Sequence, residues 1–97
     1  MNPSRDDALR RLASIEGHLR GVRKMIEDDA YCVDVLKQTY AVQRAIGKLE
    51  DVLLEGHLKS CVPEGFAEGR ADAVLAELGD LFELRSEERR VGKECRL

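Results

Sequence analysis

The stretch that decides the fold of this chain is YCVDVLKQTYAVQRAIGKLEDVLLEGHLKSC, residues 31–61. It holds no proline, and its apolar residues recur at intervals of three and four, which predicts one long amphipathic helix. The apolar stripe is wide, so we expect it to be covered on more than one side, as in an oligomeric helical bundle. Its members are Val33, Leu36, Tyr40, Ile46, Leu49, Val52, Leu53 and Leu58, with Val35, Val42, Ala45 and Leu54 widening it.

A first helix is predicted over residues 5–28, ahead of that stretch. Ser4 followed by Asp7 resembles a helix start, and the apolar residues after it keep a spacing of three and four. Residues 28–30 form a short break before the long helix. The apolar positions of the first helix are Leu9, Leu12, Ile15, Leu19, Val22 and Ile26.

Pro63 and Gly65 follow the long helix, and we expect them to end it. A third, shorter helix is predicted over residues 67–84 from its apolar spacing. No strand pattern competes, so the predicted fold class is all-α, with a single domain over residues 1–85. Residues 86–97 lose the periodicity and are highly charged, so we expect a disordered tail there, with a non-native extension as the open alternative.

Composition favours a small protein that gains part of its core by association. The 97 residues allow one domain at most. Hydrophobic residues make up 43%, but the chain has no Trp, two Phe and two Tyr, and a small chain with few aromatics buries little by itself. The N-terminal segment lacks the apolar core of a signal peptide, and no run of ~18 apolar residues predicts a membrane span. Three cysteines, an odd number, then favour reduced thiols in the cytoplasm.

Charge is unevenly distributed along the chain. The formal net charge is −3, which argues against a nucleic-acid binder if taken alone. Residues 8–24, however, contain five Lys or Arg against one acid, a net of +4, whereas residues 64–83 contain six acids against one Arg, a net of −5. Such separation allows a basic face on an acidic protein.

Cys32, His57 and Cys61 point to a metal site. His57 and Cys61 are four residues apart, so on a helix they share one face about a turn apart. Cys32 precedes His57 by 25 residues, which is ~37 Å along a helix axis and too far for one ion to be held within one chain. If the three groups form one site, Cys32 comes from one chain and the other two from a second chain. Two antiparallel copies of the long helix then make two equal sites per dimer.

The donor set favours copper. Two thiolates and one imidazole suit a soft ion of low coordination number, and Cu(I) fits best. Zn(II) requires a fourth ligand or water, and Ni(II) or Co(II) more nitrogen or oxygen donors. His18 lies in the middle of the first helix and is not expected to be a ligand, and Cys95 in the tail is excluded. Taken singly, each of the three residues has an ordinary explanation, since cysteine often fills buried space. Their combination favours a site.

Any contact with DNA must come from basic residues, because neither a helix-turn-helix pattern nor zinc-finger spacing is present. On the first helix Ala13, Gly17 and Gly21 share the outward face and keep it flat, which lets the Arg and Lys around it approach phosphates closely. Judged without further information, these are ordinary solvated residues. The candidate contacts are Arg10, Arg11, Arg20, Arg23 and Lys24 of the first helix and Arg44 and Lys48 of the second, with Lys37 as an extension of the patch.

Three runs of this sequence resemble the copper-sensing operon repressor (CsoR) family of bacterial regulators, within a wider group of nickel/cobalt, formaldehyde and persulfide sensors. The runs are IEGHLRGVRKMIE at residues 15–27, DDAYCVDVLKQTYAVQ at residues 28–43 and EGHLKSC at residues 55–61. The resemblance covers residues 8–84.

The ligand pattern matches the copper branch of that group. Formaldehyde sensors retain the first cysteine but lack a cysteine at position 61, persulfide sensors keep both cysteines but generally lack the histidine, and nickel sensors add further histidines. This chain has Cys32, His57 and Cys61 together.

The resemblance implies a three-helix protomer that forms an antiparallel four-helix-bundle dimer, and then a dimer of dimers. It implies that the basic residues contact operator DNA in the metal-free form and that Cu(I) binding releases the DNA. It also implies a second layer around the metal, with Tyr31 beside Cys32 and Glu77 in the third helix, because a ligating histidine needs an acceptor for its other ring nitrogen.

Two other functions stay open. One is a thiol-based sensor of the same group, in which Cys32 and Cys61 are persulfidated or oxidised, and which has no need of His57. The other is a copper-storage bundle without a DNA partner. An enzyme is not expected, because the chain shows neither a second carboxylate pair at E-x-x-H spacing nor a nucleophile with an evident base.

Overall fold

The structure is a computed structural model that describes the backbone of residues 2–94 and the side chains of residues 4–85. Every element within that range is helical, which confirms the all-α class. The elements are α1 (Asn2–Glu27), α2 (Cys32–Gly56), the π-helical segment η1 (His57–Cys61), α3 (Val62–Ala67) and α4 (Ala71–Glu94). The chain divides into two compact units, Met1–Cys61 and Val62–Leu97, so the expectation of a single domain stays a prediction.

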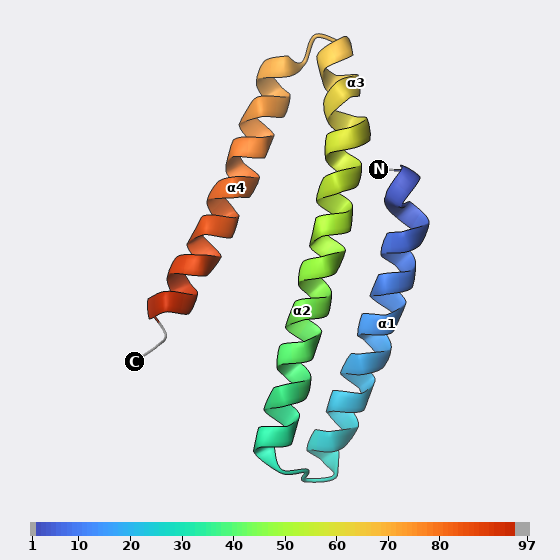
Figure 1. The fold of residues 1–97 in the computed structure, drawn as a ribbon, viewed down its shortest axis with the longest axis vertical. Helices are drawn as coiled ribbons and strands as arrows, with labels where there is room; N and C mark the ends of the chain where they lie inside the picture. Colours follow the sequence, from blue (N-terminus) through green and yellow to red (C-terminus); the bar gives the residue numbers. More distant parts are fainter. Residues whose placement is uncertain (1, 95–97) are drawn as a thin grey trace. The chain divides into compact units, whose positions relative to one another are not determined.

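The first unit is an antiparallel hairpin of α1 and α2, which lie side by side along most of their length (Figure 1). Its core is small and is formed by Ile15 and Val22 of α1 against Val42 of α2. The partly buried side chains of Val35, Ala45 and Leu49 pack on that core. The 3-4 spacing seen in the sequence therefore selects the faces that meet.

The turn between α1 and α2 is a Schellman motif, which satisfies the last carbonyl groups of α1. Asp29 adopts a left-handed conformation with φ of 55°, and aspartate is among the few non-glycine residues that do so readily. The N–H of Ala30 donates to the carbonyl of Met25 at 2.9 Å, and the N–H of Asp29 to that of Ile26 at 3.2 Å. Tyr31 is the N-cap of α2 and makes no side-chain capping bond.

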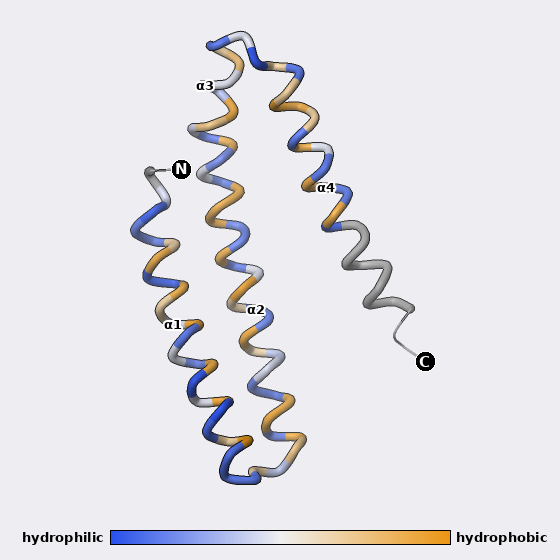
Figure 2. The backbone as a smooth tube through the Cα atoms, turned by 180° about the vertical axis from the view of Figure 1, so that it is seen from behind, coloured by the Kyte–Doolittle hydropathy of each residue, from blue (hydrophilic) through white to orange (hydrophobic). Residues whose placement is uncertain are grey.

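The isolated chain buries little of its apolar surface. Only Ala8, Ile15, Val22, Val42, Val62 and Val74 are buried among the hydrophobic side chains that the structure describes. Large apolar side chains stay exposed on both helices of the hairpin, including Ile26 at 59%, Leu36 at 48% and Tyr40 at 54%. Figure 2 shows hydrophobic positions recurring along α1 and α2. The wide stripe predicted from the sequence is therefore present, and one chain does not cover it.

The predicted end of the long helix at Pro63 is wrong. Helical bonding continues through η1 into α3, and the break falls at residues 68–70. The first turn of a helix tolerates proline because its N–H has no essential partner there, and Pro63 is the second residue of α3. Gly69 ends α3 in a left-handed conformation with φ of 79°. The N–H of Arg70 donates to the carbonyl of Gly65 at 2.8 Å, which forms a second Schellman motif.

The second unit is the α3–α4 corner. A Cβ atom added to the buried Gly65 would clash with Cγ2 of Val74, so these two helices approach each other closely here. The third helix begins at Ala71 rather than at residue 67 and extends to Glu94 rather than to residue 84. The extension is explained by the Glu, Arg and Lys content of this stretch, since these residues favour helix. The predicted disordered tail is thus corrected for the backbone of residues 86–94, while Cys95 lies outside the described residues.

Within the part of the chain that the structure describes, no helix is both long enough and apolar enough to cross a membrane.

Candidate metal centre and basic surface

The three predicted ligands lie at the two ends of α2. Cys32 is its first residue and is exposed, whereas His57 and Cys61 follow its last turn and are half-buried. At a rise of ~1.5 Å per residue, the 25-residue α2 spans ~37 Å. Figure 1 shows it as one rod between the turn and the η1 segment. The structure therefore places His57 and Cys61 in one five-residue segment and leaves Cys32 far from both within one chain.

A single chain offers no complete metal site in its described part. Nowhere among those residues do three or more His, Cys, Asp or Glu side chains gather as an ion would require. Cys32 and Cys61 both carry thiols. Each protomer thus presents two incomplete halves, a thiol at the start of α2 and an imidazole–thiol pair after its end. Two thiols and one imidazole are together a donor set that suits a soft ion.

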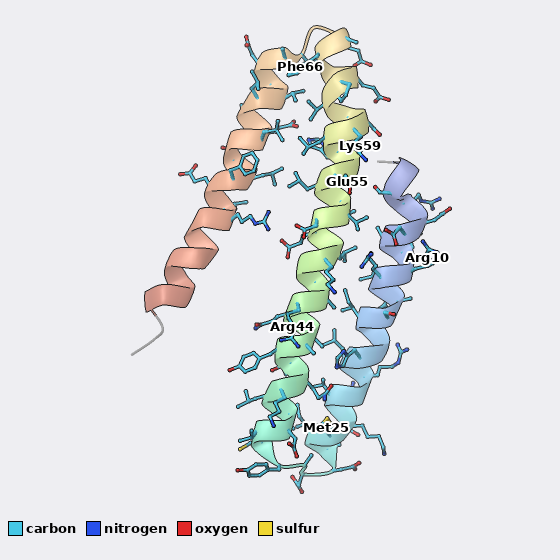
Figure 3. All side chains as sticks on the ribbon, in the orientation of Figure 1. Arg10, Met25, Arg44, Glu55, Lys59 and Phe66 are labelled. Atoms are coloured by element: carbon cyan, nitrogen blue, oxygen red, sulfur yellow. The ribbon has the colours of Figure 1, made fainter. Side chains whose placement is uncertain are left out.

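His57 and Cys61 are the first and last residues of a π-helical segment, a feature that our sequence analysis missed. Helical turns with i→i+5 bonding are rare and are frequent at functional sites. At the junction with α2, the N–H of His57 is shared between the carbonyls of Leu53 and Leu54. The side chain of Lys59 donates to Glu55 at 2.6 Å (Figure 3).

The second-layer residues stay predictions. Tyr31 is 68% exposed beside Cys32, and Glu77 is an exposed residue of α4.

His18 has a partner that the sequence did not reveal. Its Nε2 lies 2.7 Å from Oε1 of Gln38 on α2, so the ring N–H donates to the amide oxygen. The bond joins the two helices of the hairpin.

The candidate DNA contacts fall into two groups. Four of them are matched by acids on α1 or in the turn that follows it: Arg10 and Arg11 by Asp7 at 3.3 Å each, Arg23 by Glu27 at 2.9 Å and Lys24 by Asp28 at 3.4 Å. Among the described side chains, Arg20, Arg44 and Lys48 enter no ion pair with an acid. Figure 3 shows Arg10 on α1 and Arg44 on α2. Unmatched cations give up no existing partner when they meet phosphate.

An all-α hairpin with cysteine and histidine half-sites and a basic first helix is the arrangement of a metal-responsive regulator. This chain belongs to the family of metal-sensitive transcriptional repressors, which it matches over residues 4–84. Members of this family are repressors and not enzymes.

This chain is similar to copper-sensing repressors of other bacteria. The copper-sensing transcriptional repressor CsoR of Mycobacterium ulcerans is 45% identical over 73 residues, which cover 75% of this chain. The chain spans 62% of the length of that relative. CsoR of Bacillus subtilis is 41% identical over 78 residues, which cover 80% of this chain and 77% of the relative.

Two solved structures resemble the fold. The copper-sensing repressor CsoR with Cu(I) from Geobacillus thermodenitrificans NG80-2 has a TM-score of 0.81 at 37% identity, covering 89% of this chain and 90% of that one. The nickel-responsive transcriptional regulator InrS has a TM-score of 0.67 at 35% identity, covering 80% of this chain and 88% of that one. The likeness to the copper-sensing repressor shows an all-α fold with three helices per chain.

Proposed function

We propose that this protein is a Cu(I)-responsive transcriptional repressor. In its metal-free form it binds operator DNA, and it releases the DNA when Cu(I) binds at a subunit-bridging site of Cys32 with His57 and Cys61 of the partner. The observation that carries the proposal is the placement of a thiol and an imidazole–thiol pair at opposite ends of one 25-residue helix. The names of the copper-sensing relatives support it.

Self-association is part of this proposal. The exposed apolar side chains of α1 and α2 need a cover, and a second copy of the hairpin supplies one in an antiparallel four-helix bundle. Antiparallel pairing of α2 with its copy places Cys32 opposite His57 and Cys61. Two-fold symmetry then creates two equal sites, and two such dimers form the proposed tetramer.

The chain's own residues supply the chemistry of the site. Two thiolates and one imidazole would hold Cu(I) at low coordination number. Glu77 and Tyr31 are the proposed acceptors for the second ring nitrogen of His57, which would fix its tautomer and orientation.

DNA binding is proposed to rest on Arg20, Arg44 and Lys48, with the acid-matched cations contributing less. Phosphate contacts supply most of the sequence-independent affinity, and each neutralised phosphate adds to the salt dependence. A tetramer would present four copies of these residues to the DNA.

Repression and copper sensing are then linked thermodynamically. If Cu(I) lowers the affinity for DNA by a given factor, DNA must lower the affinity for Cu(I) by the same factor. The form that binds metal best is therefore the form that binds DNA worst.

The test combines metal and DNA titrations of the full chain. Duplexes selected from a random pool by the metal-free protein serve as the DNA probe. We expect anaerobic Cu(I) to reduce DNA affinity at least ~10-fold, within the usual range of coupling, and Cys32→Ala to abolish both Cu(I) binding and release. A chain that binds Cu(I) but no DNA at low salt would be a storage protein. Persulfide-driven release that persists in His57→Ala would identify a thiol sensor.

A further inference from the structure

We infer that Pro63 is a positioning residue for the metal site, because it imposes the π-helical turn that carries His57 and Cys61. The effect of Pro63 on Cu(I) binding rests on the proposed function. Its effect on the backbone can be tested without copper. Pro63 lies two residues beyond η1, in the first turn of α3.

The argument begins with what proline does to a helix. In α-helical bonding, residue 63 would donate its N–H to the carbonyl of Lys59. Proline has no N–H, and its ring crowds the carbonyl four residues earlier. Lys59 is the central residue of η1. In i→i+5 bonding, the carbonyl of Lys59 would accept from residue 64 and not from Pro63. A π turn at this place therefore does not need the N–H that Pro63 lacks.

The consequence concerns the two ligands. In an α-helix, residues four apart are separated by ~6 Å along the axis and by ~40° around it. A π turn holds more residues, so it gives the same two positions a different angular offset. His57 and Cys61 occupy the two ends of the segment. The angle between their side chains determines how well both can bind the same ion. Pro63 therefore acts on the site through the backbone, without contacting metal.

Other residues explain the π segment less well. Gly56 precedes it and is buried, but a glycine permits many conformations and demands none. The ion pair between Glu55 and Lys59 joins residues four apart, a spacing that α-helices accommodate equally.

The experiment compares Pro63→Ala with Glu64→Ala in the full-length chain. Both changes place alanine on an exposed position in the first turn of α3, and both favour helix, so folding is preserved. We expect Pro63→Ala to convert residues 57–63 of the metal-free protein to α-helical bonding. Backbone NMR shifts and slowed amide exchange in that segment report the conversion. Glu64→Ala should leave the segment unchanged.

The metal readout is the Cu(I) affinity measured against a competing chelator, together with the thiolate-to-copper absorption. Groups that orient metal ligands typically change affinity by ~10–100-fold, so we expect a loss of at least ~10-fold and an altered band in Pro63→Ala only. A π segment that persists in Pro63→Ala would overturn the inference, as would wild-type affinity in a segment that has become α-helical. Failure of the wild type to bind Cu(I) would refute the proposed function instead, and the NMR result would still decide the backbone claim.

Discussion

Arg44 and Arg23 carry the same charge on neighbouring helices, yet their surroundings differ. Arg23 lies 2.9 Å from Glu27 one turn away, whereas Arg44 makes none of the ion pairs formed by described side chains. Exposed pairs of this kind are worth at most ~1 kcal/mol, so Arg23 can be recruited by phosphate, but only by releasing Glu27. A phosphate contact is therefore more favourable at Arg44, because Arg44 breaks no ion pair to make it.

We predict that Arg44→Ala reduces the salt dependence of DNA binding more than Arg23→Ala does. Each lost phosphate contact removes ~0.9 from the slope of log K against log salt. The measurement is fluorescence anisotropy with a random-sequence duplex between ~50 and ~200 mM salt. Equal losses in the two variants would show that the acidic partners are irrelevant to DNA binding.

A substitution of Glu77 tests how Cu(I) binding is coupled to the release of DNA. As the proposed acceptor for His57, it is not a ligand itself, so Glu77→Ala should retain Cu(I) binding within ~100-fold of the wild type. The release of DNA by Cu(I) should weaken markedly. Glu83→Ala, another exposed acid of α4, is the control. Undiminished DNA release by Cu(I) in Glu77→Ala would show that Glu77 does not couple metal binding to DNA binding.

At the residue level, much of the candidate site could be predicted. Cys32, His57 and Cys61 are recognisable because their donor chemistry and spacing are properties of the sequence itself. The partner of His18 could not be predicted, because Gln38 is 20 residues away and comes into reach only when the hairpin forms. The acid partners of Arg10 and Arg23 lie three or four residues away and were accessible in principle.

The helices themselves were largely predictable, and their ends were not. Periodicity identifies α1, α2 and α4 because each carries its apolar residues at intervals of three and four. The error came at Pro63, where proline was given its usual meaning as a helix end. The chain instead changes its bonding to a π turn before Pro63, and α3 continues to Ala67, where the left-handed Gly69 of the following turn terminates it. A proline is compatible both with a helix end and with a π turn followed by a new helical turn, and the periodicity of apolar residues does not distinguish the two.

The α3–α4 corner makes a prediction at the level of elements. Gly65 has no room for a Cβ against Val74, whereas nothing lies within 4 Å of a Cβ placed on Gly79 of α4. Gly65→Ala should therefore lower the free energy of unfolding by ~1–3 kcal/mol through overpacking, partly offset by better helix propensity. Gly79→Ala should raise it by up to ~1 kcal/mol.

Urea denaturation at a fixed protein concentration measures both values. A stabilised Gly65→Ala variant would mean that α4 does not pack against α3 as described.

For the molecule as a whole, the decisive quantity is the apolar surface left uncovered. No large side chain within residues 4–85 is completely buried, and the core cluster of the first unit contains three buried residues. Such a hairpin is not expected to be stable alone. If α2 pairs antiparallel with its copy so that Cys32 meets His57 and Cys61, the two-fold axis passes close to Ile46, midway between them.

We predict that Ile46→Lys dissociates the dimer, because it places two like charges beside the axis and removes buried apolar surface. Sedimentation velocity should show the mass of a single chain in place of that of the proposed wild-type tetramer, and bridged Cu(I) binding should be lost with it. Gln43→Lys adds the same charge at an exposed polar position of α2 and should change neither property. Retained Cu(I) binding by a monomeric Ile46→Lys protein would contradict the bridged site.

The central claim, that each metal site is shared between two chains, is tested most directly by mixing defective subunits. Cys32→Ala lacks the first half of the site, and the double variant His57→Ala, Cys61→Ala lacks the second. Neither homo-oligomer should bind Cu(I) tightly. Hetero-oligomers prepared from differently tagged copies should regain one tight Cu(I) per mixed dimer, because the intact halves then face each other. Mixed dimers that bind no Cu(I), or a homo-oligomer of either variant with wild-type affinity, would contradict the account.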